Sequence, residues 1–233
     1  MLRKLKSSMW QANEAIQKNN DSENTYVHVW NLTSKGVGHT AIQVGEGENQ
    51  AYTSIHPDFI PACGPLAVVP LPANIATTLD EDMAIEGMSR HDGGDLDAPF
   101  GISNTEPTPA KPERTIKIAG LDTKAMRKEI QAVNERVAEG DTYYQLIPKV
   151  NTHAFFKDLP TLISQDPVDA TLAQKQDQLH TSSPTYNCAT LVSHILKTGG
   201  AAPMKSSSVP WHPTPNDVMY YAEELSSDLP ENK

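Results

Sequence analysis

Cysteine is scarce in this chain, with only Cys63 and Cys188 among 233 residues. Two distant cysteines do not make a disulfide scaffold, so we expect reduced thiols in a cytosolic setting, with a single disulfide as the less favoured alternative. Long apolar runs are missing too. No stretch of about 18 apolar residues occurs, which predicts that no segment spans a membrane. The first 20 residues lack the apolar stretch and cleavage site of a conventional secretory signal.

Positive charge and metal-binding motifs are also in short supply. The chain has 19 Lys and Arg against 29 Asp and Glu, a formal net charge of −10. Nucleic-acid-binding proteins carry a basic stripe, so this balance argues against a nucleic-acid partner. No C-x-x-C or H-E-x-x-H spacing occurs, and the Gly-rich turn at 45–49 lacks the Lys-Ser of a phosphate loop. The sequence therefore predicts neither a metal site nor a cofactor.

The pattern along the chain predicts one folded domain at 25–225. Residues 1–24 have apolar side chains spaced by three or four, which predicts an N-terminal helix and linker. The end, 226–233, is an acidic tail. Inside the domain, 57–114 is expected to be mostly irregular and 142–183 to be a helical insertion.

Alternating and β-branched segments predict strands, and segments with apolar residues every three or four positions predict helices. We expect strands at 25–33, 38–45, 50–56 and 115–121, the first three forming an antiparallel meander. Helices are expected from Asp122 or Thr123 to Gly140, at 186–200 and at 213–225. Because no regular βαβ alternation occurs, the expected fold class is α+β.

Cys188 occupies the first turn of a well-marked helix, directly after Asn187. A helix N-terminus presents unpaired N–H groups and a partial positive charge, which favour a thiolate. The same N–H groups can hold the oxyanion formed when a thiolate attacks a carbonyl. The alternative is that Cys188 is a small buried residue of the helix's apolar stripe.

His39 favours the catalytic interpretation. It begins a strand after Gly38, on the face opposite Thr40 and Ile42, where we do not expect a packed core residue. A thiol nucleophile needs such an imidazole as ion-pair partner, general base and later proton donor. Distance along the chain is no objection, since such partners meet in the fold.

Strand pairing suggests a third residue. If the turn spans 46–49, His39 lies opposite His56 with the two side chains on one face. His56 would then orient His39 through a ring hydrogen bond. A register shift of two residues would place Ser54 or Asp58 there instead.

Two segments, GHTAIQVGEG (38–47) and YNCATLV (186–192), resemble the permuted NlpC/P60-type papain-like superfamily, which includes the lecithin:retinol acyltransferase-like proteins. The resemblance implies a papain-like fold with Cys188 as nucleophile, His39 as base and a second histidine on the next strand as orienting group. The matching residues are His39, Ala41, Ile42, Val44, Gly45, Gly47, Asn187 and Cys188.

Three further motifs resemble uncharacterised papain-like domains of secreted bacterial effectors: YTSIHP (52–57), NCATLV (187–192) and the later PTPNDVMYYA (213–222). The end of the chain, 220–233, resembles a glutamate-rich type IV secretion signal. These resemblances imply export into a host cell and a host protein as partner.

The leading functional hypothesis is a cysteine-dependent hydrolase or acyl-transferring enzyme acting on an amide, ester or thioester of a protein or other acyl-bearing substrate. Peptidase, amidase, deamidase and lipid acyltransferase share this chemistry, and a fold does not choose among them. Oxyanion or orienting candidates beside the main pair are Asn187, Ser54 and Tyr186. The competing hypothesis is an inactive interaction module that uses 57–114 or 142–183 as its partner surface.

Overall fold

The computed structural model describes residues 23–31, 38–58, 67–92, 108–147, 184–204 and 213–227. The statements below concern these residues. The predicted N-terminal helix, Cys63, most of the predicted insertion at 142–183 and the tail beyond Ser227 lie outside them. Across the described ranges, no helix is long and apolar enough to cross a membrane.

Seven strands form one sheet, in the spatial order β5-β1-β2-β3-β4-β6-β7. Neighbouring strands are antiparallel except for β6 and β7, which are parallel. The first three strands are adjacent in space, so the predicted meander is confirmed. The strands are β1 (Thr25–Trp30), β2 (His39–Val44), β3 (Ala51–Pro57), β4 (Leu71–Ala76), β5 (Arg114–Ile118), β6 (Tyr143–Tyr144) and β7 (Thr185–Tyr186); the 3₁₀ turn η1 (Gly47–Asn49) joins β2 to β3.

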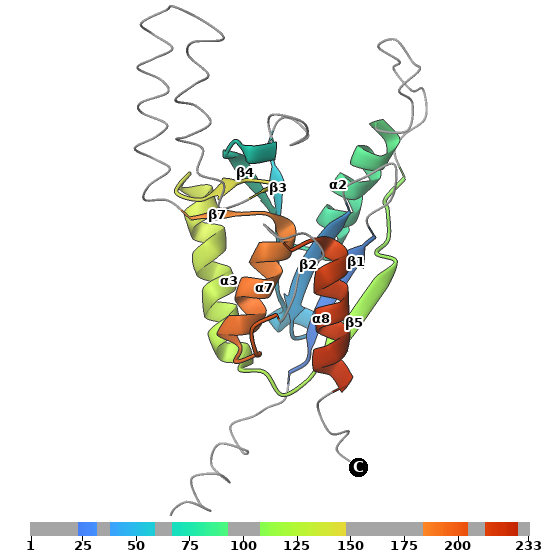
Figure 1. The fold of residues 1–233 in the computed structure, drawn as a ribbon, viewed down its shortest axis with the longest axis vertical. Helices are drawn as coiled ribbons and strands as arrows, with labels where there is room; N and C mark the ends of the chain where they lie inside the picture. The colour runs from blue at the N-terminus through green and yellow to red at the C-terminus, as the bar shows by residue number, and fades with distance from the viewer. Residues whose placement is uncertain are drawn as a thin grey trace, which may run out of the picture.

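Three helices cover one face of the sheet. They are α3 (Thr123–Ala138), α7 (Cys188–Thr198) and α8 (Pro215–Ser227), with α7 between the other two (Figure 1). Valine and isoleucine side chains of β1, β2, β3 and β5 point to this face and pack against the apolar stripes of the helices. This is the main core, and it places the start of α7 against the middle strands.

The opposite face is also covered, by α2 (Leu79–Asp92) and the segment around Ala110. A smaller apolar cluster forms there from Trp30, Ala41, Tyr52 and Ala76, with Leu79 and Met83 of α2 packed against it. Both faces of the central strands are therefore shielded from water, which is why polar side chains on the second face are buried as well.

The α3 prediction is confirmed in detail. Asp122 caps the helix by accepting a hydrogen bond from the Ala125 N–H. The buried residues of α3 are Met126, Ile130, Val133 and Val137, and the chain leaves the helix at Gly140 with a positive φ of 77°. The molecule has the expected α+β class, with an antiparallel-rich sheet and four helices among its described residues.

The expectation that 57–114 is mostly irregular is wrong for its middle. This range contains β4, paired with β3 and β6 inside the sheet, and the 14-residue helix α2. The helix was missed because its buried side includes Asp82 and Gly87, so its apolar residues do not form a clear stripe.

Candidate active site

His39 and His56 face each other across β2 and β3. The two strands pair with Ile42 opposite Thr53 and Val44 opposite Ala51. Continuing that register puts His39 opposite His56, and their rings stack with centroids 4.2 Å apart at 23°. The predicted juxtaposition of the two histidines is confirmed.

The expectation that His39 is not packed like a core residue is wrong, since only 3% of it is exposed. Its ring lies 5.4 Å from that of Trp30, its partner on β1, and α2 covers it from the other side. Both faces of the sheet are covered here, so a histidine on the second face becomes a buried group that must find charged or polar partners.

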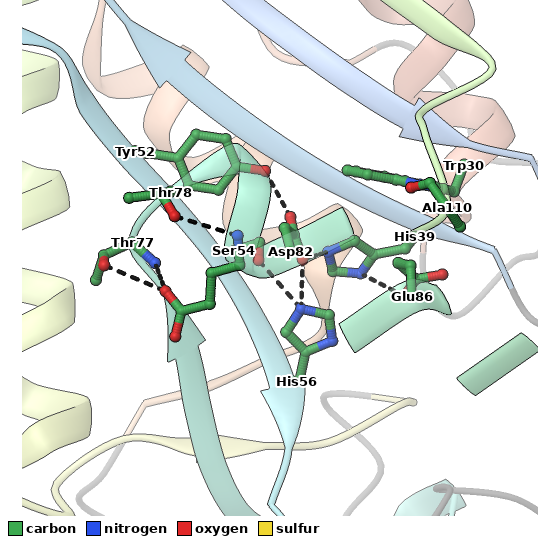
Figure 2. Close-up of polar contacts among 11 residues, drawn as sticks. Trp30, His39, Tyr52, Ser54, His56, Thr77, Thr78, Asp82, Glu86 and Ala110 are labelled. Carbon is green, nitrogen blue, oxygen red and sulfur yellow. Dashed lines mark hydrogen bonds and ion pairs between the residues drawn. The ribbon is translucent and has the colours of Figure 1, made fainter. Parts of the chain in front are cut away.

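Asp82 supplies that partner and is the residue that sequence reasoning missed. It lies on the buried side of α2 and has no exposed surface. Oδ2 accepts a 2.6 Å hydrogen bond from the Tyr52 hydroxyl, and Oδ1 lies 2.6 Å from His56 Nε2 and 3.2 Å from His39 Nε2. Figure 2 shows these side chains converging on one carboxylate.

The contact between His39 and Asp82 is an ion pair whose N–H does not point straight at the oxygen, so His39 Nε2 has no well-angled hydrogen bond. Burial lowers the pKa of His39. The Asp82 carboxylate and the Cys188 thiol outweigh that effect and raise the pKa of His39 well above its usual 6.5. These contacts favour the protonated form of the imidazole.

The neighbouring groups respond in the opposite sense. Burial raises the pKa of Asp82, but the two imidazoles outweigh it and hold that pKa far below 3.8. Burial and the charge on His39 lower the pKa of His56. The cluster thus favours a charged His39 beside an ionised Asp82, with His56 neutral.

Cys188 is the first residue of α7 and is 6% exposed. Its thiol interacts with the His39 imidazole. Residues 149 positions apart in the sequence therefore meet in the fold, as the catalytic interpretation requires. At this helix end the Thr190 N–H is bonded to the Asn187 cap, while the N–H groups of Cys188 and Ala189 precede the first intrahelical bond.

Asn187 fixes the start of α7. Its Oδ1 accepts from the Thr190 N–H at 2.7 Å, the Thr190 hydroxyl accepts from the Asn187 N–H, and its Nδ2 donates to the Leu146 carbonyl at 2.8 Å. Both ends of its amide are therefore occupied, which makes Asn187 a positioning residue for Cys188.

Of the other two predicted candidates, Ser54 belongs to the cluster and Tyr186 contacts a histidine outside it. Ser54 is buried in the cluster, with Oγ 3.2 Å from His56 Nε2. Tyr186 packs its ring against His194, with centroids 5.5 Å apart. Tyr144 was not predicted but lies near Cys188. Burial raises the pKa of Tyr144, and interactions with Cys188 and Glu86 add to that effect.

Glu86 adds a second carboxylate, one turn after Asp82 on α2. Its Oε1 lies 4.0 Å from His39 Nδ1. His39, His56 and Glu86 form the group of potential metal ligands found among the described residues. The sequence predicted no metal site because these residues come from three elements and form no local motif.

No family model, no curated protein and no solved structure matches this chain.

Proposed function

We propose that this protein is a cysteine-dependent hydrolase or acyl-transferring enzyme with Cys188 as nucleophile. One observation carries the proposal. A thiol at a helix N-terminus lies beside an imidazole that a buried carboxylate keeps charged. An imidazolium next to a sulfur stabilises the thiolate, which is the nucleophilic form.

In the proposed resting state the Cys188 proton already lies on His39, so that a thiolate and an imidazolium face each other. Because His39 Nε2 faces Asp82, Nδ1 is the nitrogen that carries this proton. The thiolate then forms a bond to the carbonyl carbon of an amide, ester or thioester, and the N–H groups at the start of α7 stabilise the oxyanion.

The second half releases the acyl group. His39 gives its proton to the leaving group as the carbonyl bond to that group breaks, which leaves an acyl-enzyme on Cys188. His39 then takes a proton from water or from another acceptor nucleophile. Attack by that nucleophile breaks the thioester and releases the Cys188 thiolate beside the protonated His39, which restores the starting state.

Asp82 is the orienting residue in this proposal, in place of the predicted His56. Its carboxylate contacts His39 directly and stabilises the imidazolium. His56 acts through Asp82, because its 2.6 Å hydrogen bond holds the carboxylate and its ring supports that of His39. Tyr52 holds the other carboxylate oxygen.

We also retain the permuted papain-like superfamily as a proposal for the fold. Its support is an antiparallel sheet whose inner strand β2 carries the base, together with a later helix that begins at the nucleophile. The effector hypothesis, with export into a host cell, depends on sequence resemblance and stays a proposal.

The test is the pH dependence of alkylation by iodoacetamide, measured by peptide mass spectrometry with Cys63 as internal comparison. We expect Cys188 to be alkylated faster than Cys63 at neutral pH, because a charged His39 beside the sulfur stabilises the thiolate. His39→Gln and Asp82→Asn should remove that difference. If Cys188 reacts no faster than Cys63 and neither substitution changes it, the enzyme proposal fails and the interaction module is favoured.

A further inference from the structure

The stacked histidines and Glu86 define a second arrangement within the same cluster. One ligand atom from each of His39, His56 and Glu86 lies within 4.8 Å of the other two. We propose that these three side chains bind a zinc-class divalent cation, and that the bound ion blocks the thiol chemistry of Cys188. The binding stands by itself, whereas the blocking effect rests on the proposed function.

The histidines are arranged as metal ligands usually are. Both Nε2 atoms face Asp82 Oδ1, at 3.2 Å for His39 and 2.6 Å for His56. A metal-binding histidine commonly gives its other ring N–H to a carboxylate, which sets the tautomer and the ring orientation. Asp82 has this arrangement with His56 and an ion-pair contact with His39, so each Nδ1 would be left to the metal.

Glu86 lies on the side of the histidines where the metal would bind, near His39 Nδ1. Its Oε1 is 4.0 Å from His39 Nδ1, and Figure 2 shows it beside the ring edge opposite Asp82. Asp82 and Glu86 are four residues apart, so they lie on the same face of α2. One helix therefore supplies both the supporting carboxylate and the proposed ligand.

The donor set and its burial fit zinc. The side chains of His39, His56 and Glu86 are 4%, 9% and 13% exposed. Two imidazoles and one carboxylate, with a fourth position open, are a known zinc ligand set, with bonds of about 2.0–2.2 Å. Such bonds put tetrahedral ligands roughly 3.3–3.6 Å apart, so side-chain shifts of about 1 Å close the site.

Metal binding and proton transfer compete for one atom. The ion would replace the proton on His39 Nδ1, the nitrogen that carries the Cys188 proton in the proposed reaction. A metal-bound His39 holds no proton to pair with the thiolate. Occupation should therefore abolish the His39-dependent alkylation of Cys188.

The first experiment measures binding with Co²⁺ as a spectroscopic probe, followed by displacement with Zn²⁺, on the full chain. In the wild type we expect the visible absorption bands of Co²⁺ bound in a low-symmetry coordination site. Glu86→Gln should weaken binding by at least about tenfold, the lower end of the effect of losing a supporting residue. Asp80→Asn, the same charge change at an exposed position of α2, should leave binding unchanged. No cobalt spectrum, or equal affinities in the two variants, would overturn the proposal.

The second experiment tests blocking. Saturating Zn²⁺ should protect Cys188 from iodoacetamide in the wild type and in Asp80→Asn, but not in Glu86→Gln at the same zinc concentration. If cobalt binds through Glu86 while zinc leaves the alkylation unchanged, the blocking effect is refuted. Alkylation without metal reports on the proposed function separately. Should Glu86→Gln lose its circular dichroism signal, His56→Gln replaces it in both experiments.

Discussion

At the scale of single residues, Asp82 organises the cluster. Its two oxygens contact Tyr52, His56 and His39, three side chains from two strands. A carboxylate with no exposed surface is costly to bury unless such partners surround it. Removing one partner leaves part of the Asp82 charge uncompensated. A single substitution around Asp82 should therefore lower the free energy of unfolding by a measurable amount.

Tyr52→Phe tests the hydrogen bond from the Tyr52 hydroxyl to Asp82. The change leaves Asp82 Oδ2 without its 2.6 Å hydrogen bond in a buried site. Loss of a hydrogen bond to a charged group should reduce the free energy of unfolding by about 1.5–3 kcal/mol, measured by urea unfolding. Tyr220→Phe is the control, since Tyr220 is 64% exposed and its loss should cost less than about 0.5 kcal/mol. Equal effects in the two variants would show that the Tyr52 bond contributes nothing.

At the scale of elements, two helices bring the site together. The start of α7 carries Cys188, and α2 carries Asp82 and Glu86. Neither helix forms the site alone, so the positions of both helices against β2 and β3 determine its geometry. Changes that displace one helix should affect the reactivity of Cys188 without touching a site residue.

Gly87→Ala should displace α2. A Cβ at Gly87 would clash with the Thr108 carbonyl oxygen and the Pro109 backbone. The helix must shift to relieve that contact, so we expect slower Cys188 alkylation at neutral pH together with lower stability. Ala84→Gly, at an exposed position of the same helix, is the control. It should cost about 1 kcal/mol through helix propensity while leaving the alkylation rate unchanged.

Asn187→Ala should displace the start of α7. Loss of the cap should cost about 0.5–2 kcal/mol and leave the Leu146 carbonyl without its donor. Because Cys188 follows the cap directly, its alkylation should slow as well. Asp122→Ala removes the exposed cap of α3 and should destabilise the protein without changing Cys188. Alkylation slowed equally by both variants would indicate general destabilisation instead.

At the scale of the whole molecule, burial of both sheet faces makes stability depend on pH through three buried histidines. The pKa of His39 is raised above 6.5, so its contribution is complete below pH 6.5 and is lost as pH rises through its folded pKa. Burial lowers the pKa values of His56 and His28, so their contribution is present above pH 6.5 and is lost as pH falls.

We therefore expect the free energy of unfolding to be greatest near pH 6.5, measured by urea unfolding from about pH 5 to pH 9. His39→Gln should remove the decline on the alkaline side while keeping the one on the acid side. A wild-type profile that rises steadily from neutral to alkaline pH would contradict the raised pKa of His39.

The amino-acid sequence by itself determined the strands and helices that show a clear apolar pattern over a few neighbouring residues. The alternation in 38–45 and the apolar steps of 123–138 are enough to place β2 and α3, because hydrophobic burial acts through neighbours one to four residues apart. Strand register followed from the length of the turn, and it brought His39 opposite His56.

Only the tertiary structure decided that Asp82 belongs to the site. In the sequence it stands in a run of three acids at a helix start, the usual place for solvated charges that favour the helix dipole. What distinguishes it from Asp80 and Glu81 is burial against Tyr52, His39 and His56, which comes from packing α2 on the second face of the sheet. The pKa values of the cluster and the grouping of Glu86 with two histidines follow from that packing, because desolvation and charge contacts exist only once the chain is folded.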